Sequence, residues 1–151
     1  MQRLPFFVYG TLRVGQGNYQ HILAGNTVRE VRNVRLQDHI MYSSGVGFVF
    51  DDSTSQFSVL GDVIWVDEAV YLQVSARLDR LEGVYDAKTG KGHSYCRVQR
   101  EVYLPEELAG EPGEPVTIWV YQGSENVRVS FQDRGTRDLV ADGDWVRYAG
   151  R

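Results

Sequence analysis

Residues 4–13 of this 151-residue chain read Leu-Pro-Phe-Phe-Val-Tyr-Gly-Thr-Leu-Arg, and the fold prediction starts from this stretch. Its compact apolar run predicts a buried strand, and the pair Tyr9-Gly10 predicts a turn directly after it. A strand that ends in glycine can turn sharply and leave successive backbone N–H groups unpaired, which attracts a carboxylate or an oxyanion. We expect Gly10 to need a backbone conformation that a side chain would strain or block. An ordinary tight turn after an edge strand fits the same residues.

Further strand and helix patterns follow along the chain. Asn18 can cap a short helix at 19–24, and Gly25 can end it. Strand patterns occur at 28–43 (long, and bent or bulged), 46–50, 58–66, 94–104 and 116–121. The segment 105–115 is rich in Glu, Gly and Pro and predicts a turn, while 125–151 has only weak patterning. Several strands around one main helix predict the α+β class, with an antiparallel sheet or barrel.

The main helix is expected at 68–82, capped by Asp67 and ended by Gly83. Its apolar residues recur at helical spacing and predict a buried stripe of Val70, Tyr71, Val74, Leu78 and Leu81. Asp79 and Arg80 are interpreted as a solvated pair on the outer face.

Glu82 is the residue of this helix most suited to proton transfer. It lies eleven residues after Tyr71, close to three helical turns, and therefore projects from the same partly buried face. Burial and the negative end of the helix dipole both raise the proton affinity of a carboxylate, toward the range of a general base. An exposed last-turn glutamate without a function fits the same position.

The composition sets limits on fold and partners. The length predicts a single domain over 1–151, and 42% hydrophobic with 24% charged residues is ordinary for a globular protein. A formal charge of -4 argues against a nucleic-acid partner. One cysteine, Cys96, allows no internal disulfide, and no apolar run approaches the roughly 20 residues that span a bilayer. We therefore expect a cytoplasmic protein without a membrane partner; the oligomeric state stays open.

Familiar cofactor and metal motifs are missing from the sequence. His21, His39 and His93 are far apart and have no ligand partners at metal spacing. Gly15-Gln16-Gly17 lacks the third glycine and the strand–helix–strand context of a dinucleotide site. We expect neither a metal site nor an organic cofactor.

Taken together, the motifs resemble the γ-glutamylcyclotransferase-like family, which includes γ-glutamylamine cyclotransferases and AIG2-like proteins. Tyr9-Gly10-Thr11-Leu12, with 15–18 close behind, looks like the family signature after a first strand. Further matches, in the family's order, are the Leu-Asp-x-x-Glu helix end at 78–82, Tyr95-Cys96-Arg97, Trp119-Val120-Tyr121 and Asp144-Trp145. The chain departs from the family in two places. The segment 41–47 lacks the proline of many relatives, and the loop 86–92 is long, so the substrate's identity stays open.

The resemblance implies a small mixed β-barrel of about six to seven strands with flanking helices and a cavity between them. It implies an enzyme that converts a γ-glutamyl amine or peptide to 5-oxoproline and a free amine, with Glu82 as general acid/base. Tyr9, Gly10, Thr11 and Leu12 would contact the substrate. Tyr95 and Tyr121 are weaker candidates for the cavity wall, and for both a tyrosine packed in the core is an equal alternative.

Two other functions remain compatible with the sequence. The same fold could serve as a non-catalytic small-molecule binding module. Alternatively, a γ-glutamyl hydrolase-like activity would admit water and release glutamate in place of 5-oxoproline.

Overall fold

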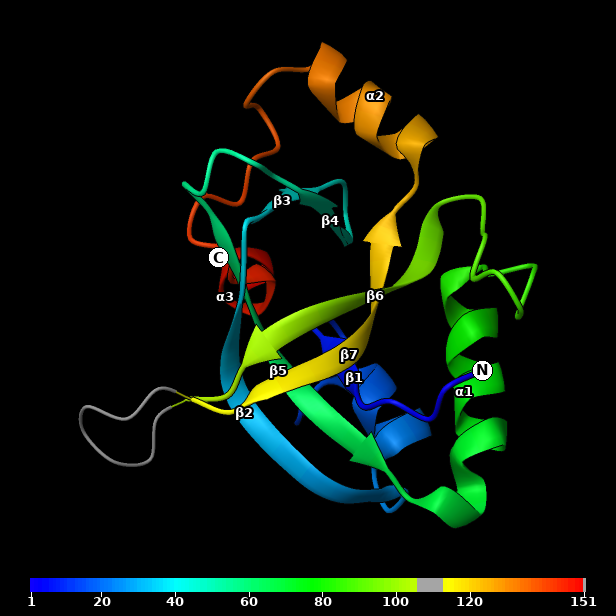
Figure 1. The fold of residues 1–151 in the computed structure, drawn as a ribbon. Helices are drawn as coiled ribbons and strands as arrows, with labels where there is room; N and C mark the ends of the chain where they lie inside the picture. The colour runs from blue at the N-terminus through cyan, green and yellow to red at the C-terminus, as the bar shows by residue number, and fades with distance from the viewer. Residues whose placement is uncertain (106–112, 151) are drawn as a thin grey trace.

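The computed structural model describes residues 1–105 and 113–150, and it confirms the α+β class (Figure 1). The strands are β1 (Phe6–Val8), β2 (Thr27–Gln37), β3 (His39–Ser43), β4 (Gly47–Asp51), β5 (Ser58–Val66), β6 (Tyr95–Tyr103) and β7 (Pro115–Gly123). The helices are α1 (Tyr71–Glu82), α2 (Glu125–Asp133) and α3 (Trp145–Ala149), with a short π-helical segment at Tyr19–Leu23 and a 3₁₀ turn at Glu68–Val70. Part of the turn predicted at 105–115 lies outside the described residues.

The main sheet has five strands in the order β2-β5-β1-β7-β6. Its pairs are antiparallel except for β1 beside β7, which run parallel, and β3 and β4 form a separate hairpin. The outer strands β2 and β6 approach each other but form no ladder. The expected barrel is therefore not closed: the sheet is curled and open, with the hairpin beside it.

Two left-handed residues explain why the β structure at 27–43 does not continue as one strand. Asn33 has φ = 60°, and it lies where the register of β2 against β5 shifts, so the expected bulge is present. Asp38 has φ = 59° and separates β2 from β3. This conformation redirects the chain out of the main sheet, and β3 pairs with β4 instead of extending the curl.

The first strand lies in the centre of the sheet and is buried on both faces. Phe6 and Val8 pack toward α1, in a cluster that includes Tyr71 and Leu78. Phe7 points to the other face, into the cluster that contains the hairpin residues. A strand covered on both faces is apolar at successive positions, which accounts for the uninterrupted run that begins the chain.

Helix α1 has the ends that the sequence predicts. The Asp67 side chain accepts a hydrogen bond from the Ala69 N–H at 3.0 Å, although a 3₁₀ turn precedes the α-helix. Gly83 has φ = 78°, and the Gly83 and Val84 N–H groups donate to carbonyls of the last turn. This is a Schellman ending, which leaves Glu82 as the last helical residue. The stripe prediction was wrong at Leu81, whose residue surface is 43% exposed.

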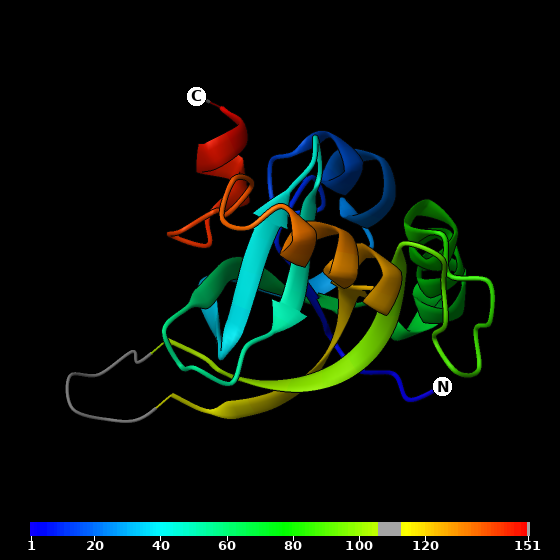
Figure 2. The same ribbon diagram turned by 90° about the horizontal axis from the view of Figure 1, so that it is seen from above.

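The C-terminal segment contains two helices that weak patterning did not predict. Figure 2 shows α2 across the β3–β4 hairpin, with α1 and the N-terminus on the opposite side of the molecule from the C-terminus. Phe131 of α2 packs with Phe48 and Phe50 in a small third cluster. At α3 the Asp144 side chain accepts a hydrogen bond from the Arg147 N–H at 3.1 Å, which is an N-cap. Among the described residues no helix has the length and hydropathy needed to cross a membrane.

Candidate active site

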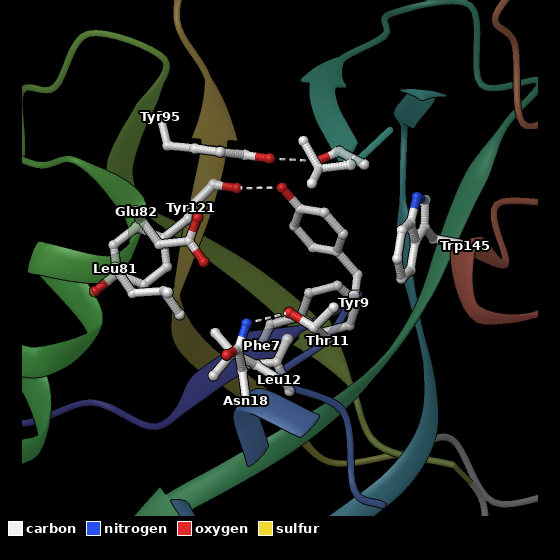
Figure 3. Close-up of a pocket in the computed structure, with 14 residues that line it drawn as sticks. Phe7, Tyr9, Thr11, Leu12, Asn18, Leu81, Glu82, Tyr95, Tyr121 and Trp145 are labelled. Atoms are coloured by element: carbon white, nitrogen blue, oxygen red, sulfur yellow. Dashed lines mark hydrogen bonds between the residues drawn. The ribbon is translucent and has the colours of Figure 1, made fainter. Parts of the chain in front are cut away.

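A cavity of about 180 Å³ lies between the loop after β1, the end of α1 and the β3–β4 turn (Figure 3). The seven residues that the sequence singled out, Tyr9, Gly10, Thr11, Leu12, Glu82, Tyr95 and Tyr121, all line it. Figure 3 shows the Glu82 carboxylate facing the cavity from the α1 side, with Trp145 on the opposite side. Residues more than one hundred positions apart in the chain therefore share one concave surface.

Among the described residues, the loop after β1 uses its carbonyls but not its N–H groups in hydrogen bonds. Within the described part of the chain, no acceptor bonds the N–H of Gly10, Thr11 or Leu12. Their carbonyls, in contrast, are used: the Gly10 carbonyl accepts from the Arg13 N–H at 3.0 Å, and the Thr11 carbonyl from the Tyr19 N–H at 3.1 Å. The loop thus keeps a rigid shape while presenting three free donors, which suits an anionic group.

Side chains behind this loop fix its shape. The fully buried Asp62 of β5 accepts from the Val14 N–H at 3.0 Å and from the Arg13 guanidinium at 3.2 Å. The Asn18 amide donates to the Thr11 hydroxyl at 2.6 Å. The prediction that Asn18 caps the helix after it was therefore wrong, because no cap bond forms and the side chain holds the loop instead.

The expectation of a strained backbone at Gly10 was also wrong. Gly10 is absent from the residues with positive φ, and a Cβ there would lie 3.9 Å from the Trp145 ring, an ordinary contact. The glycine that the cavity requires is Gly47, where a Cβ would lie 2.9 Å from Trp145 Cδ1. The indole therefore sets the residue size allowed at the start of β4.

Glu82 carries a half-buried carboxylate that faces the cavity. Among the described residues it has neither a hydrogen-bond partner nor a salt-bridge partner. Burial raises its pKa from the ordinary 4.5 to about 7. At neutral pH this group can therefore both take up and release a proton, as a general acid/base must.

Three tyrosines surround the carboxylate with their phenols held in place. The Tyr9 hydroxyl donates to the Tyr121 carbonyl at 2.6 Å, and the Tyr95 hydroxyl donates to the Gly47 carbonyl at 2.7 Å. Burial raises the pKa of all three phenols; at Tyr121 Asp79 is the next contributor, and the Glu82 charge adds a smaller increase at each phenol. They stay protonated at neutral pH, which leaves Glu82 as the proton acceptor of the group.

The Tyr121 hydroxyl leads to a buried network below the cavity. It donates to Asp79 at 2.6 Å, and the other oxygen of Asp79 pairs with Arg97. Arg97 also donates to the Ala87 carbonyl at 2.6 Å and stacks on Trp119. The interpretation of Asp79 as solvated was wrong, because it is buried; Arg80 is exposed as expected. The network joins the end of α1 to the two strands beside it.

Among the described residues, seven more line the cavity that sequence reasoning did not single out as site residues: Phe7, Val8, Asn18, Val46, Gly47, Leu81 and Trp145. Trp145 belongs to the Asp144-Trp145 match, but nothing in the pattern showed that its indole would reach the cavity. Its Nε1 donates to the Ser43 hydroxyl at 3.3 Å, which ties α3 to the hairpin. The described residues contain no group of three or more His, Cys, Asp or Glu that could hold a metal ion.

Comparisons with known proteins agree on the fold. A family model described as gamma-glutamyl cyclotransferase, AIG2-like, matches residues 6–147. An AIG2-like protein from Mus musculus superposes with a TM-score of 0.52 at 23% identity, covering 81% of this chain and 78% of that one. An uncharacterized protein from Pyrococcus horikoshii gives a TM-score of 0.53 at 15% identity, covering 97% of this chain and 95% of that one. A protein from Arabidopsis thaliana gives 0.55 at 14% identity, covering 89% of this chain and 87% of that one. No curated protein sequence matches the chain.

Proposed function

The chain belongs to the gamma-glutamyl cyclotransferase, AIG2-like family, and from this premise we propose that it cyclises a γ-glutamyl amide to 5-oxoproline and a free amine. The α-amine of the substrate attacks its own γ-carbonyl, a new C–N bond closes a five-membered ring, and the original amide C–N bond breaks. The enzyme need not supply a nucleophile, because holding the two reacting groups together provides much of the acceleration.

Glu82 is the proposed general acid/base. It accepts a proton from the attacking nitrogen and returns it to the nitrogen that leaves, so it ends the cycle as it began. A pKa of about 7 suits both steps near neutral pH. The neutral phenols of Tyr95 and Tyr121 form the wall beside it and take no proton.

The loop after β1 is the proposed anion site for the glutamyl part. The free N–H groups of Gly10, Thr11 and Leu12 would bind the substrate carboxylate or the oxyanion that develops on the γ-carbonyl. In Figure 3 the Tyr9 ring lies across from Glu82, on the side of Trp145, and it would contact the chain of the glutamyl group.

One observation carries the proposal: a carboxylate and a set of backbone donors, both without partners among the described residues, line the same cavity. A base for the amine and an electrophilic site for the carbonyl are what intramolecular aminolysis requires. A non-catalytic binding module would need the donors but would gain nothing from a half-buried, unpaired carboxylate, which costs stability.

The test is incubation of the purified protein with a panel of γ-glutamyl amides, with 5-oxoproline measured by mass spectrometry. Glu82→Gln should lower the rate by about 100- to 10,000-fold, the usual contribution of a general acid/base. Glu101→Gln is the matched control, because Glu101 is exposed on β6 and does not line the cavity. Unchanged turnover in Glu82→Gln rejects the assignment of the base.

A substrate with an acetylated α-amine separates the cyclotransferase from the hydrolase. Acetylation removes the nucleophile, so the blocked amide should not react. Release of N-acetylglutamate would show that water attacks the carbonyl, and the hydrolase activity would then replace the cyclotransferase.

A further inference from the structure

A second cavity, of about 230 Å³, shares no lining residue with the candidate active site. The loop after β1 contributes to both: residues 10–12 line the first cavity, and Arg13 and Val14 line the second. The start of α3 divides in the same way, with Trp145 in the first cavity and Asp144 in the second. Further lining of the second cavity comes from the bulge of β2 and from β5. The second cavity is therefore a separate concave site between four elements of the fold.

Two exposed arginines line this cavity with N–H groups that form no hydrogen bond to the described part of the protein. Arg32 of β2 has neither a hydrogen-bond partner nor a salt-bridge partner there. The Arg147 side chain is 70% exposed, and its Nη1 lies 3.8 Å from the Asp142 carboxylate, beyond hydrogen-bond length. Both guanidinium groups therefore keep their N–H donors available to a ligand.

A third arginine, Arg13, is buried and also keeps a free nitrogen. Its Nη2 donates to the Asn33 side-chain oxygen at 2.8 Å and to Asp62 at 3.2 Å. Its Nη1 lies 3.6 Å from Asp144 Oδ1, an ion pair without a hydrogen bond. The same Asp144 oxygen accepts the Arg147 N–H at 3.1 Å, so the one carboxylate in the described lining is already engaged. Free donors thus outnumber free acceptors in this cavity.

We propose that the second cavity binds a phosphate group, either as inorganic phosphate or as the phosphoryl group of a small ester. The site is distinct from the proposed cyclotransferase reaction and does not depend on it. Arg32 of β2 and Arg147 of α3 would donate to the phosphate oxygens, and the Asn33 amide N–H groups, which have no acceptor among the described residues, would add to them.

The chemistry of the donors favours phosphate over other anions. A guanidinium group donates two parallel hydrogen bonds, and such charge-assisted bonds are about twice as strong as neutral ones. Three guanidinium groups line the cavity, more than the two oxygens of a carboxylate can satisfy, whereas a phosphate presents three or four oxygens. Val14, Leu60 and Val146 supply a partly buried apolar part of the lining, which can contact the carbon part of an ester.

The test is a calorimetric titration of inorganic phosphate into the full chain, with the ionic strength held constant by sodium chloride. Arg32→Gln should weaken phosphate binding by about tenfold or more, the usual effect of losing a hydrogen bond from a charged group. Arg80→Gln is the matched control, because it removes the same charge from an exposed residue that lines neither cavity. Absence of phosphate binding to the wild-type protein, or equal affinities in the two variants, overturns the inference.

The free N–H groups of residues 10–12 could also attract phosphate, and a second pair of variants separates the two cavities. Glu82→Gln removes a negative charge from the candidate active site at pH 8. Phosphate in the second cavity should bind this variant and the control Glu101→Gln with the same affinity. Clearly tighter binding to Glu82→Gln would place the phosphate in the candidate active site, and the inference would be wrong.

A titration with n-propyl phosphate then distinguishes the two sources of the phosphate group. Tighter binding of the ester than of inorganic phosphate, again lost in Arg32→Gln, assigns the site to a phosphorylated small molecule whose carbon part contacts the apolar lining. Equal or weaker binding of the ester assigns it to free phosphate. Loss of neither ligand in Arg32→Gln overturns both assignments. Formation of 5-oxoproline enters none of these measurements, so rejection of the cyclotransferase reaction would leave their outcome unaffected.

Discussion

Replacing Glu82 by Gln should stabilise the protein at high pH and not at low pH. In the folded chain burial raises the Glu82 pKa to about 7, against an ordinary value of 4.5. The folded state therefore binds this proton more tightly than the unfolded state does, and the stability that the protonated group contributes is complete below pH 4.5 and lost as the pH rises through 7.

The size of the effect follows from the shift. About 2.5 pKa units at 1.36 kcal/mol each give about 3 kcal/mol above pH 7, an upper bound because the side chain is partly exposed to water. Near pH 5 the same linkage gives less than about 1 kcal/mol. Gln is neutral at every pH. The free energy of unfolding of Glu82→Gln minus that of wild type should therefore increase as the pH rises from 5 to above 7.

Urea unfolding followed by tryptophan fluorescence at pH 5, 6, 7 and 8 measures this difference directly. Other titrating groups contribute equally to both proteins and cancel. Glu101→Gln, which removes an exposed carboxylate of β6 away from the cavity, is the matched control. If Glu82→Gln and wild type change in parallel from pH 5 to 8, the carboxylate is solvated in the folded protein and the argument for a raised pKa fails.

Three further outcomes are expected. Arg97→Ala should lower the free energy of unfolding by about 3–5 kcal/mol, because it leaves the buried Asp79 carboxylate without its cation, and urea unfolding would show this; a loss below about 1 kcal/mol contradicts a buried pair. Gly47→Ala should reduce turnover and ligand affinity, because its Cβ would meet the Trp145 ring at 2.9 Å, whereas Gly10→Ala should fold normally. A larger loss of turnover in Gly10→Ala than in Gly47→Ala would show that the indole is not fixed where the structure has it. Treatment with a chelator should leave the rate of 5-oxoproline formation unchanged, and a loss restored by added metal would contradict the proposed role of Glu82 as a base acting without a metal.

The sequence predicted best where local chemistry determines local structure. Asp67 and Gly83 mark the ends of the main helix, and they do so because a cap needs only a side-chain oxygen and a left-handed residue within one turn. This placed Glu82 at the helix end, where the structure has it. Glu82 and the loop at Gly10 came from local patterns as well as from the resemblance, and the other candidates came from the resemblance. The structure brings all seven to one cavity, and their roles stay predictions.

Asp79 was misjudged because its partners are distant in sequence. Counting from Tyr71, position 79 lies two i,i+4 steps along the buried face, so its burial could have been inferred. Its polarity argued for solvent, and only the position of Arg97 on a different element reverses that argument. The barrel prediction was wrong because the chain turns out of the main sheet at Asp38. The left-handed backbone of this residue leaves no periodic signal in the sequence.

The short C-terminal helices were missed for a related reason. Helix α3 has five residues, too few to show a repeated apolar face, and α2 buries one residue, Phe131. These helices are stabilised by packing against the hairpin, and that surface does not exist until β3 and β4 have paired.

The central position of β1 has a consequence for how the chain acquires its structure. The first strand has β5 on one side and β7 on the other, and the Trp119 N–H bonds the Pro5 carbonyl at 2.9 Å across more than one hundred residues. During synthesis β1 can therefore pair with β5 but not with β7 until residues 115–123 have left the ribosome. Contacts of such long sequence separation slow folding. We expect that fragments divided between α1 and β6 would regain a working cavity only on association, because neither half contains both neighbours of β1.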